Sequence, residues 1–130
     1  MKIQSTAISL NVTDEAASAA FAQTHFGFVT SMSAEGFVSL RNPEAGFDVI
    51  FLRTGLATFA PAEIAGAAGQ GLLLVFVVDD VDAECARIAA AGARVVSEPM
   101  TEPWGERYCQ FADPNGIIWQ LVTWLDVPGT

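Results

Sequence analysis

Two successive stretches of the chain share one order of secondary-structure patterns, and this repeat constrains the fold more than any other feature. Each stretch reads strand, helix, strand, strand, strand, with apolar alternation in the strands and acidic capping residues before the helices. The first half is expected to contain a strand at 6–12, a helix at 14–26, and strands near 28–32, 36–40 and 46–53. The second is expected to contain a strand at 71–78, a helix at 79–92, and strands at 93–99, 107–113 and 116–124.

The turn and cap residues of the two halves also correspond. The expected pairs are Asp14 with Asp80, Gly27 with Gly92, Asn42-Pro43 with Asp113-Pro114, and Gly46 with Gly116. A half of about 50 residues leaves one sheet face uncovered, so two copies are expected to pair across that face. We therefore predict one α+β domain over 1–130, with module one at 1–54, a linker at 55–70 and module two at 71–130. The Ala- and Gly-rich linker could be a loop, a short helix or a lid over a site.

Composition narrows the classes of partner. The 130-residue chain is 52% hydrophobic and carries a formal net charge of −9, which argues against disorder and against nucleic acid as a partner. An acidic balance favours neutral or cationic ligands, or simply keeps a protein soluble. No segment approaches the roughly 18 apolar residues needed to cross a bilayer, and the start lacks a signal-peptide pattern, so we expect a cytoplasmic protein without membrane contact. Cys85 and Cys109 are expected to be buried free thiols.

Three segments of the chain resemble the vicinal oxygen chelate superfamily, which includes glyoxalase I, bleomycin resistance proteins and extradiol dioxygenases. They are "FADPNGIIWQLV" (111–122), "VFVVDDVDAECARIAAAGARVVSEP" (75–99) and "EPWG" (102–105). The resemblance implies two βαβββ modules that form a curved mixed sheet around a cavity, the glyoxalase/bleomycin resistance fold. It also implies that a second subunit often completes the cavity, so we expect a homodimer.

The resemblance implies four metal-ligand positions, one on the first and one on the last strand of each module. In this sequence they hold Ala7, Ile50, Leu73 and Gln120. A divalent ion needs about three or four imidazole, carboxylate or thiolate donors, and one amide beside three hydrocarbons cannot supply them. Gln120 is therefore expected to be a ligand contact or a tolerated polar residue, and no metal or other cofactor is predicted. The single histidine, His25, is expected at a helix C-terminus, away from the cavity.

Strand parity selects the side chains that face the cavity. They are Ala7, Ser9, Asn11, Phe37, Ser39, Asp48, Ile50, Leu52, Leu73, Val75, Tyr108, Gln110, Ile118 and Gln120. By resemblance to the antibiotic-binding branch, Trp104 and Phe37 are candidates for stacking on a ligand, and Asp48 or Glu106 for pairing with its charge. Trp104 could instead fill a subunit interface, and the cavity-facing side chains could simply fill the concave face. The predicted ligand-binding residues are Phe37, Ser39, Asp48, Ile50, Trp104, Tyr108, Gln110 and Gln120.

Together these features predict a protein without catalytic residues that binds and sequesters a small hydrophobic, aromatic or cationic compound such as an antibiotic. The alternative is a metal-dependent lyase, isomerase or dioxygenase of the same superfamily, if the ligand positions are misplaced by register. A metal-independent acid–base enzyme using Tyr108, Asp48 or Glu106 stays open, as does a paralogue with a collapsed pocket that binds other proteins.

Overall fold

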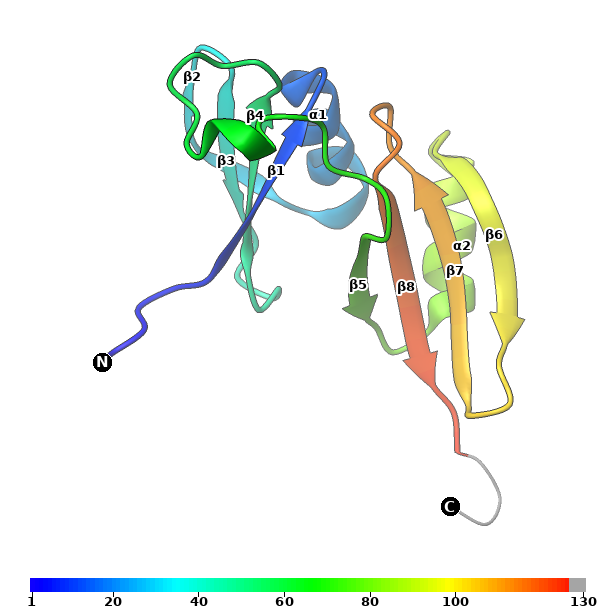
Figure 1. The fold of residues 1–130 in the computed structure, drawn as a ribbon. Coiled ribbons are helices and arrows are strands. Elements are labelled where there is room, and N and C mark those ends of the chain that lie inside the picture. Colours follow the sequence, from blue (N-terminus) through cyan, green and yellow to red (C-terminus); the bar gives the residue numbers. More distant parts are fainter. Residues whose placement is uncertain (127–130) are drawn as a thin grey trace. The chain divides into compact units, whose positions relative to one another are not determined.

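The structure, a computed structural model, describes residues 1–126 and consists of two compact units, unit 1 (Met1–Gln70) and unit 2 (Gly71–Thr130). Unit 1 contains β1 (Ala7–Val12), α1 (Glu15–Phe26), β2 (Val29–Ala34), β3 (Phe37–Arg41), β4 (Asp48–Arg53) and the short 3-10 helix η1 (Ala62–Ile64). Unit 2 contains β5 (Leu73–Val77), α2 (Val81–Ala90), β6 (Arg94–Thr101), β7 (Glu106–Ala112) and β8 (Ile118–Trp124). The predicted α+β fold of two βαβββ repeats is confirmed (Figure 1).

The two sheets have equivalent strand orders, β1-β4-β3-β2 and β5-β8-β7-β6. In each sheet the first strand runs parallel to the last, and the remaining neighbours are antiparallel. The register repeats as well, because Ser9 lies beside Ile50 in unit 1 and Val75 lies beside Gln120 in unit 2. The internal repeat therefore extends from the order of elements to individual side-chain positions.

One face of each sheet is covered by the helix of its own unit. In unit 1 the fully buried Leu40, Val49 and Phe51 lie on the face that α1 covers. In unit 2 the ring of Trp119 is fully buried and stacks on Phe76 with centroids 5.7 Å apart. Burying side chains of this size stabilises the fold by about 1.5–3 kcal/mol each. The opposite face of each sheet remains for other contacts.

Matching aspartates begin the two helices. The Asp14 carboxylate accepts a hydrogen bond from the backbone N–H of Ala17 at 3.1 Å, and Asp80 accepts one from Ala83 at 3.1 Å. Each carboxylate satisfies a backbone donor that the helix cannot, which is worth about 1 kcal/mol. At the other end of α1, Gly27 takes a left-handed conformation at φ 70, which a side chain would disfavour. The predicted cap and the predicted helix end are both confirmed.

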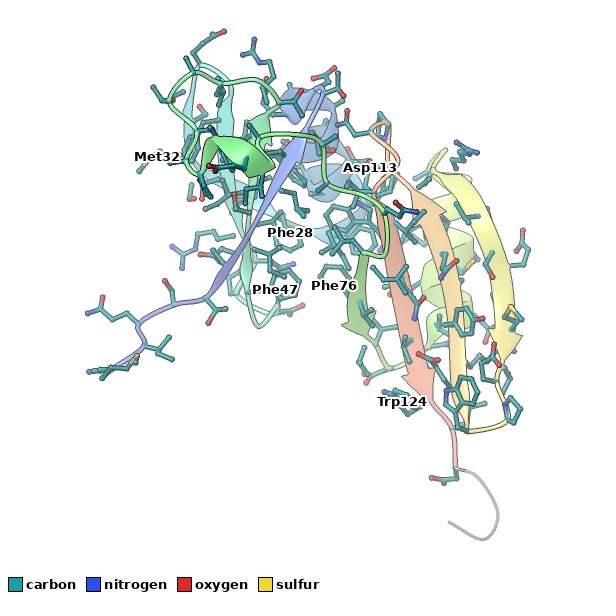
Figure 2. All side chains as sticks on the ribbon, in the orientation of Figure 1. Phe28, Met32, Phe47, Phe76, Asp113 and Trp124 are labelled. Atoms are coloured by element: carbon teal, nitrogen blue, oxygen red, sulfur yellow. The ribbon has the colours of Figure 1, made fainter. Side chains whose placement is uncertain are left out.

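The turn before the last strand of each unit begins with a residue whose side chain accepts a hydrogen bond from the backbone N–H two residues later. Asn42 accepts from the N–H of Glu44 at 3.0 Å, and Asp113 accepts from the N–H of Asn115 at 2.9 Å. Figure 2 shows Asp113 at the turn that leads into β8. The two predicted turn glycines differ, because Gly116 has φ 81 whereas Gly46 does not have a positive φ. The side-chain hydrogen bond at the start of the turn is therefore the same in both units, whereas the backbone conformation of the turn glycine differs.

Several strand ends differ from the predicted ones. β4 begins at Asp48 rather than Gly46, and the N–H of Asp48 makes the hydrogen bond to Thr6 that starts the parallel ladder. β6 continues through Pro99 to Thr101, which an edge strand tolerates where its register with the neighbouring strand is irregular. Local sequence patterns locate strands better than they locate strand ends.

The two cysteines are buried and free, as predicted. Burial, reinforced by contact with the Cys85 thiol, raises the pKa of the Cys109 thiol to about 12. Among residues 1–126, no helix combines the length and apolar character needed to span a bilayer.

Candidate functional site

The predicted cavity-facing side chains share the face of each sheet that the helix leaves open. In unit 1 the register pairs Ala7 with Asp48, Ser9 with Ile50 and Asn11 with Leu52, and it places Ser39 beside Ile50 on β3. In unit 2 it pairs Leu73 with Ile118, Val75 with Gln120, and Gln110 with Gln120. The predicted parity is therefore correct in both units.

The four predicted site residues of unit 1 do not form one cluster. Ser39 and Ile50 are direct neighbours in the register, and the Ser39 hydroxyl lies 3.3 Å from that of Ser31. Phe37 lies beside Leu52, whereas Asp48 is four residues away along β4, about 13 Å at the usual strand rise. A stacking ring at Phe37 and a charge at Asp48 would therefore contact opposite ends of a ligand.

In unit 2 the predicted site residues Trp104, Gln110 and Gln120 form a connected hydrogen-bond network with Glu106. The side-chain amide of Gln110 donates to the Gln120 carbonyl oxygen at 2.7 Å. The Gln120 amide donates to Oε2 of Glu106 at 3.4 Å, and Oε1 of Glu106 accepts from the Trp104 indole N–H at 3.2 Å. Gln120 is only 5% exposed, so these contacts satisfy a polar group that would otherwise be costly to bury. Both ends of its carboxamide are occupied by protein groups.

A largely apolar surface extends around this network. It includes Leu73, Val75, Val77 and Trp124, which the register places on the open face, together with Met100 on β6 and Trp104 in the β6–β7 turn. All six side chains are exposed. Trp104 is 61% exposed and is held by its bond to Glu106. Figure 2 shows Trp124 at the end of β8. Unit 2 thus presents flat aromatic and aliphatic surface next to a few fixed polar groups, which is the composition of small-molecule sites.

Tyr108 extends the polar part of this face to Glu102, a residue that the sequence reasoning missed. The Tyr108 hydroxyl donates to Oε1 of Glu102 at 2.9 Å. Glu102 is positioned by the turn that connects β6 and β7, where its N–H bonds the carbonyl of Glu106 and its carbonyl accepts from Gly105. The sequence signal was a glutamate and a tyrosine on either side of a Pro- and Gly-containing turn. Two carboxylates and two aromatic rings therefore lie close together in unit 2.

We predict that Glu102→Gln will lower the pKa of Tyr108 toward the ordinary tyrosine value. The hydrogen bond to Glu102, then burial, then the charges of Glu102 and Glu106 raise the pKa of Tyr108, because ionisation would remove the bond and bring like charges together. The bond's contribution to stability is thus present below the ordinary tyrosine pKa and lost as the pH rises through the raised one. Tyr108 is the single tyrosine of the chain, so absorbance at the phenolate band reports on it directly.

The control is Glu35→Gln, which removes the same charge from an exposed position in unit 1. It should leave the titration of Tyr108 unchanged. An identical titration curve for Glu102→Gln and the unmodified protein would contradict the assignment of the bond.

Comparison with known proteins identifies the family. The sequence model of the Glyoxalase/Bleomycin resistance protein/Dioxygenase superfamily matches residues 2–121. The chain belongs to this superfamily. The earlier resemblance is therefore confirmed.

The similar proteins fall into two groups by coverage. The curated relative CFP32 of Mycobacterium tuberculosis is 43% identical over 47 residues, which are 36% of this chain and only 18% of CFP32. A glyoxalase/bleomycin resistance protein/dioxygenase from Nocardioides is 25% identical with a TM-score of 0.78, covering 100% of this chain and 90% of that one. TnmS3, an antibiotic binding protein from Streptomyces sp. CB03234, is 24% identical with a TM-score of 0.72, covering 95% of this chain and 98% of TnmS3. The last likeness shows the shared fold alone.

The side chains at the four positions that the resemblance assigns to metal ligands are not a donor set that suits a divalent ion. Ala7, Ile50 and Leu73 offer hydrocarbon, and Gln120 offers an amide that Gln110 and Glu106 already engage. Within residues 1–126, no group of three or more His, Cys, Asp and Glu side chains is placed to hold a metal. Cys109 pairs with Leu121 in the register, so its thiol lies on the sheet face opposite Gln110 and Gln120. The side chains at the four positions therefore lack the three or four donors that metal chemistry needs.

His25 occupies the last turn of α1, as predicted. Its ring is buried and packs edge-on against Phe21 with centroids 4.7 Å apart. This position is on the helix and not on the open face of the unit 1 sheet. The geometry is that of a packed core residue.

Proposed function

We propose that this superfamily member binds and sequesters a small hydrophobic, aromatic or cationic organic compound, such as an antibiotic, without metal chemistry. The observation that carries the proposal is the state of Gln120. Its carboxamide is nearly buried and bonded at both ends by Gln110 and Glu106, and the other metal positions hold Ala7, Ile50 and Leu73. A site built in this way can contact an organic guest but lacks the donors that ion chemistry needs.

The open face of unit 2 supports this choice of ligand. Trp104 provides an exposed ring whose orientation is held by its bond to Glu106, and Tyr108 provides a second ring on the same face of β7 as Glu106. Planar rings favour stacking on planar guests, and the carboxylates of Glu102 and Glu106 favour guests with positive charge. TnmS3 is an antibiotic binding protein with the same fold, so the architecture is compatible with this role. A homodimer that completes the site is part of the proposal, and nucleic acid is not a proposed partner.

Ligand-induced stabilisation tests the proposal. We expect acridine orange, a planar cation, and 9-anthracenemethanol, an uncharged planar alcohol, to raise the melting temperature, and we expect EDTA not to abolish the shift. Ligand present at about 100 times its Kd contributes about 2.7 kcal/mol to stability, which corresponds to several degrees. Trp104→Ala should weaken binding about tenfold or more, because it removes a planar contact surface.

The control variant is Ile3→Ala, which removes another exposed apolar side chain outside the strands and should leave the shifts unchanged. Two outcomes would count against the proposal. One is the absence of any shift with either compound. The other is a shift that requires added nickel or zinc, which would favour the metal-dependent lyase, isomerase or dioxygenase alternative.

A further inference from the structure

We infer that unit 1 contains a binding pocket of its own, between β1 and the 55–70 segment, for an uncharged and mostly apolar molecule with one hydrogen-bonding group. This inference depends on the proposed function in one respect, namely that the ligand is a small organic compound. It goes further by locating a pocket within unit 1 and by specifying the charge of its ligand. The 55–70 segment follows β4 in the chain and contains η1 (Figure 1). Residues of this segment form one wall of the pocket.

The pocket is a hollow of about 420 Å³. This volume falls within the roughly 300–1,000 Å³ typical of small-molecule sites and far exceeds what one water molecule needs. Two lining residues come from β1 and the others from the 55–70 segment. They are Ser9, Asn11, Phe59, Ala60, Ile64, Gly66, Ala67 and Ala68.

Asn11 attaches the segment to the sheet with both its backbone and its side chain. The carbonyl oxygen of Asn11 accepts from the N–H of Ala68 at 2.8 Å, and its side-chain amide donates to the carbonyl of Ile64 at 3.4 Å. At the start of the segment, the N–H of Thr54 bonds the carbonyl of Val12 at 2.9 Å. The outer wall of the pocket is therefore anchored to β1 at positions on both sides of η1.

The chemistry of the lining specifies the charge of the ligand. No lining side chain carries a charge, although the chain has fifteen Asp and Glu residues. The polar side chains are the Ser9 hydroxyl and the Asn11 carboxamide, and the bond to Ile64 uses only one of the several hydrogen bonds that a carboxamide can form. A charged guest would lose hydration without gaining an opposite charge, which is unfavourable. An uncharged guest with one hydroxyl or carbonyl fits this lining.

The shape of the lining favours a flat guest. Phe59 provides a half-buried ring on the segment, and small side chains at Ala60, Ala67 and Ala68 leave the volume beside it open. Gly66 also lines the pocket, and a Cβ atom built there would meet no atom within 4 Å. The segment can therefore accept larger side chains that would fill the pocket, which makes the inference testable by substitution.

The test uses three naphthalene probes that differ in charge: 2-naphthol, 2-naphthoate and 2-naphthylmethylammonium. We expect 2-naphthol to bind the full chain about tenfold or more tightly than either charged probe, measured by calorimetric titration near neutral pH. Ala67→Trp should weaken 2-naphthol binding by about tenfold or more, because its indole occupies the guest's volume. Ala62→Trp places the same side chain on η1 outside the lining and should change binding less than about twofold.

A second filling variant, Gly66→Leu, should reproduce the effect of Ala67→Trp and guards against one variant failing to fold. Unchanged 2-naphthol binding in both folded variants would contradict the inferred pocket in unit 1. If Trp104→Ala abolished 2-naphthol binding in that case, the proposed function would still be supported, with the ligand bound at unit 2. A charged probe could bind as tightly as 2-naphthol or more tightly, and lose that binding in the filling variants. This result would contradict the inference that the ligand is uncharged. If 2-naphthol does not bind at all, the inference fails even where acridine orange still stabilises the protein.

Discussion

Replacement of Asp113 by alanine is expected to lower the free energy of unfolding by about 3–4 kcal/mol, because three N–H groups lose the carboxylate that accepts their hydrogen bonds. Oδ1 of Asp113 accepts from the N–H groups of Asn115 and Ile117 at 2.9 and 3.0 Å, and Oδ2 accepts from the indole of Trp119 at 3.2 Å. Asp113 is only 4% exposed, so water cannot easily replace the carboxylate. Urea unfolding followed by tryptophan fluorescence measures the loss.

Two further variants separate the hydrogen bonds from the charge. Asp126→Ala removes the same charge from an exposed position and should change stability by less than about 0.5 kcal/mol. Asp113→Asn keeps one acceptor oxygen but presents a donor to one of the three N–H groups, so its effect should be intermediate. A loss for Asp113→Ala as small as that of Asp126→Ala would show that the turn does not depend on this carboxylate.

The features predicted correctly from the sequence are those set by short-range geometry. Alternation along a strand assigns each side chain to a face, and Ser9, Ile50, Val75 and Gln120 all lie on the predicted face. Helix capping is equally local, because an aspartate three residues before a backbone N–H can bond it whatever the surrounding fold. The repeat reinforced both predictions, since each half provided an independent instance.

The features missed depend on turns and on segments without periodicity. The contact between Glu102 and Tyr108 exists because a turn folds β6 back on β7, and the spacing of the two residues does not report that geometry. The 55–70 segment has no alternation to interpret, so its choice between loop, short helix and lid could not be decided. The structure shows one short helix, η1, and a connection to β1 through Asn11. Phe59 lines a pocket in the structure, which the Ala- and Gly-rich composition of the segment does not indicate.

We expect Gln120→Glu to lower the free energy of unfolding by about 3 kcal/mol at pH 7. The substitution keeps the side chain's shape but puts a carboxylate opposite Oε2 of Glu106, which now accepts from the Gln120 amide at 3.4 Å. The change removes a donor, adds like-charge repulsion, and buries charge at a position that is 5% exposed. Gln70→Glu adds the same charge at an exposed position and should have little effect.

The pH dependence of the Gln120→Glu variant distinguishes this mechanism from loss of packing. Burial and the neighbouring carboxylate would both raise the pKa of the introduced group in the folded state above its unfolded value. The destabilisation is then full above the raised pKa, decreases as the pH falls, and disappears once the group is protonated in both states. Gln120→Met, which adds no charge, should show no such recovery. Urea unfolding between pH 4.5 and 8 measures the free energy of unfolding of these variants. A loss of stability that does not change with pH would show that the cost of Gln120→Glu comes from packing. No loss of stability would contradict the buried, hydrogen-bonded amide on which the proposed metal-free function depends.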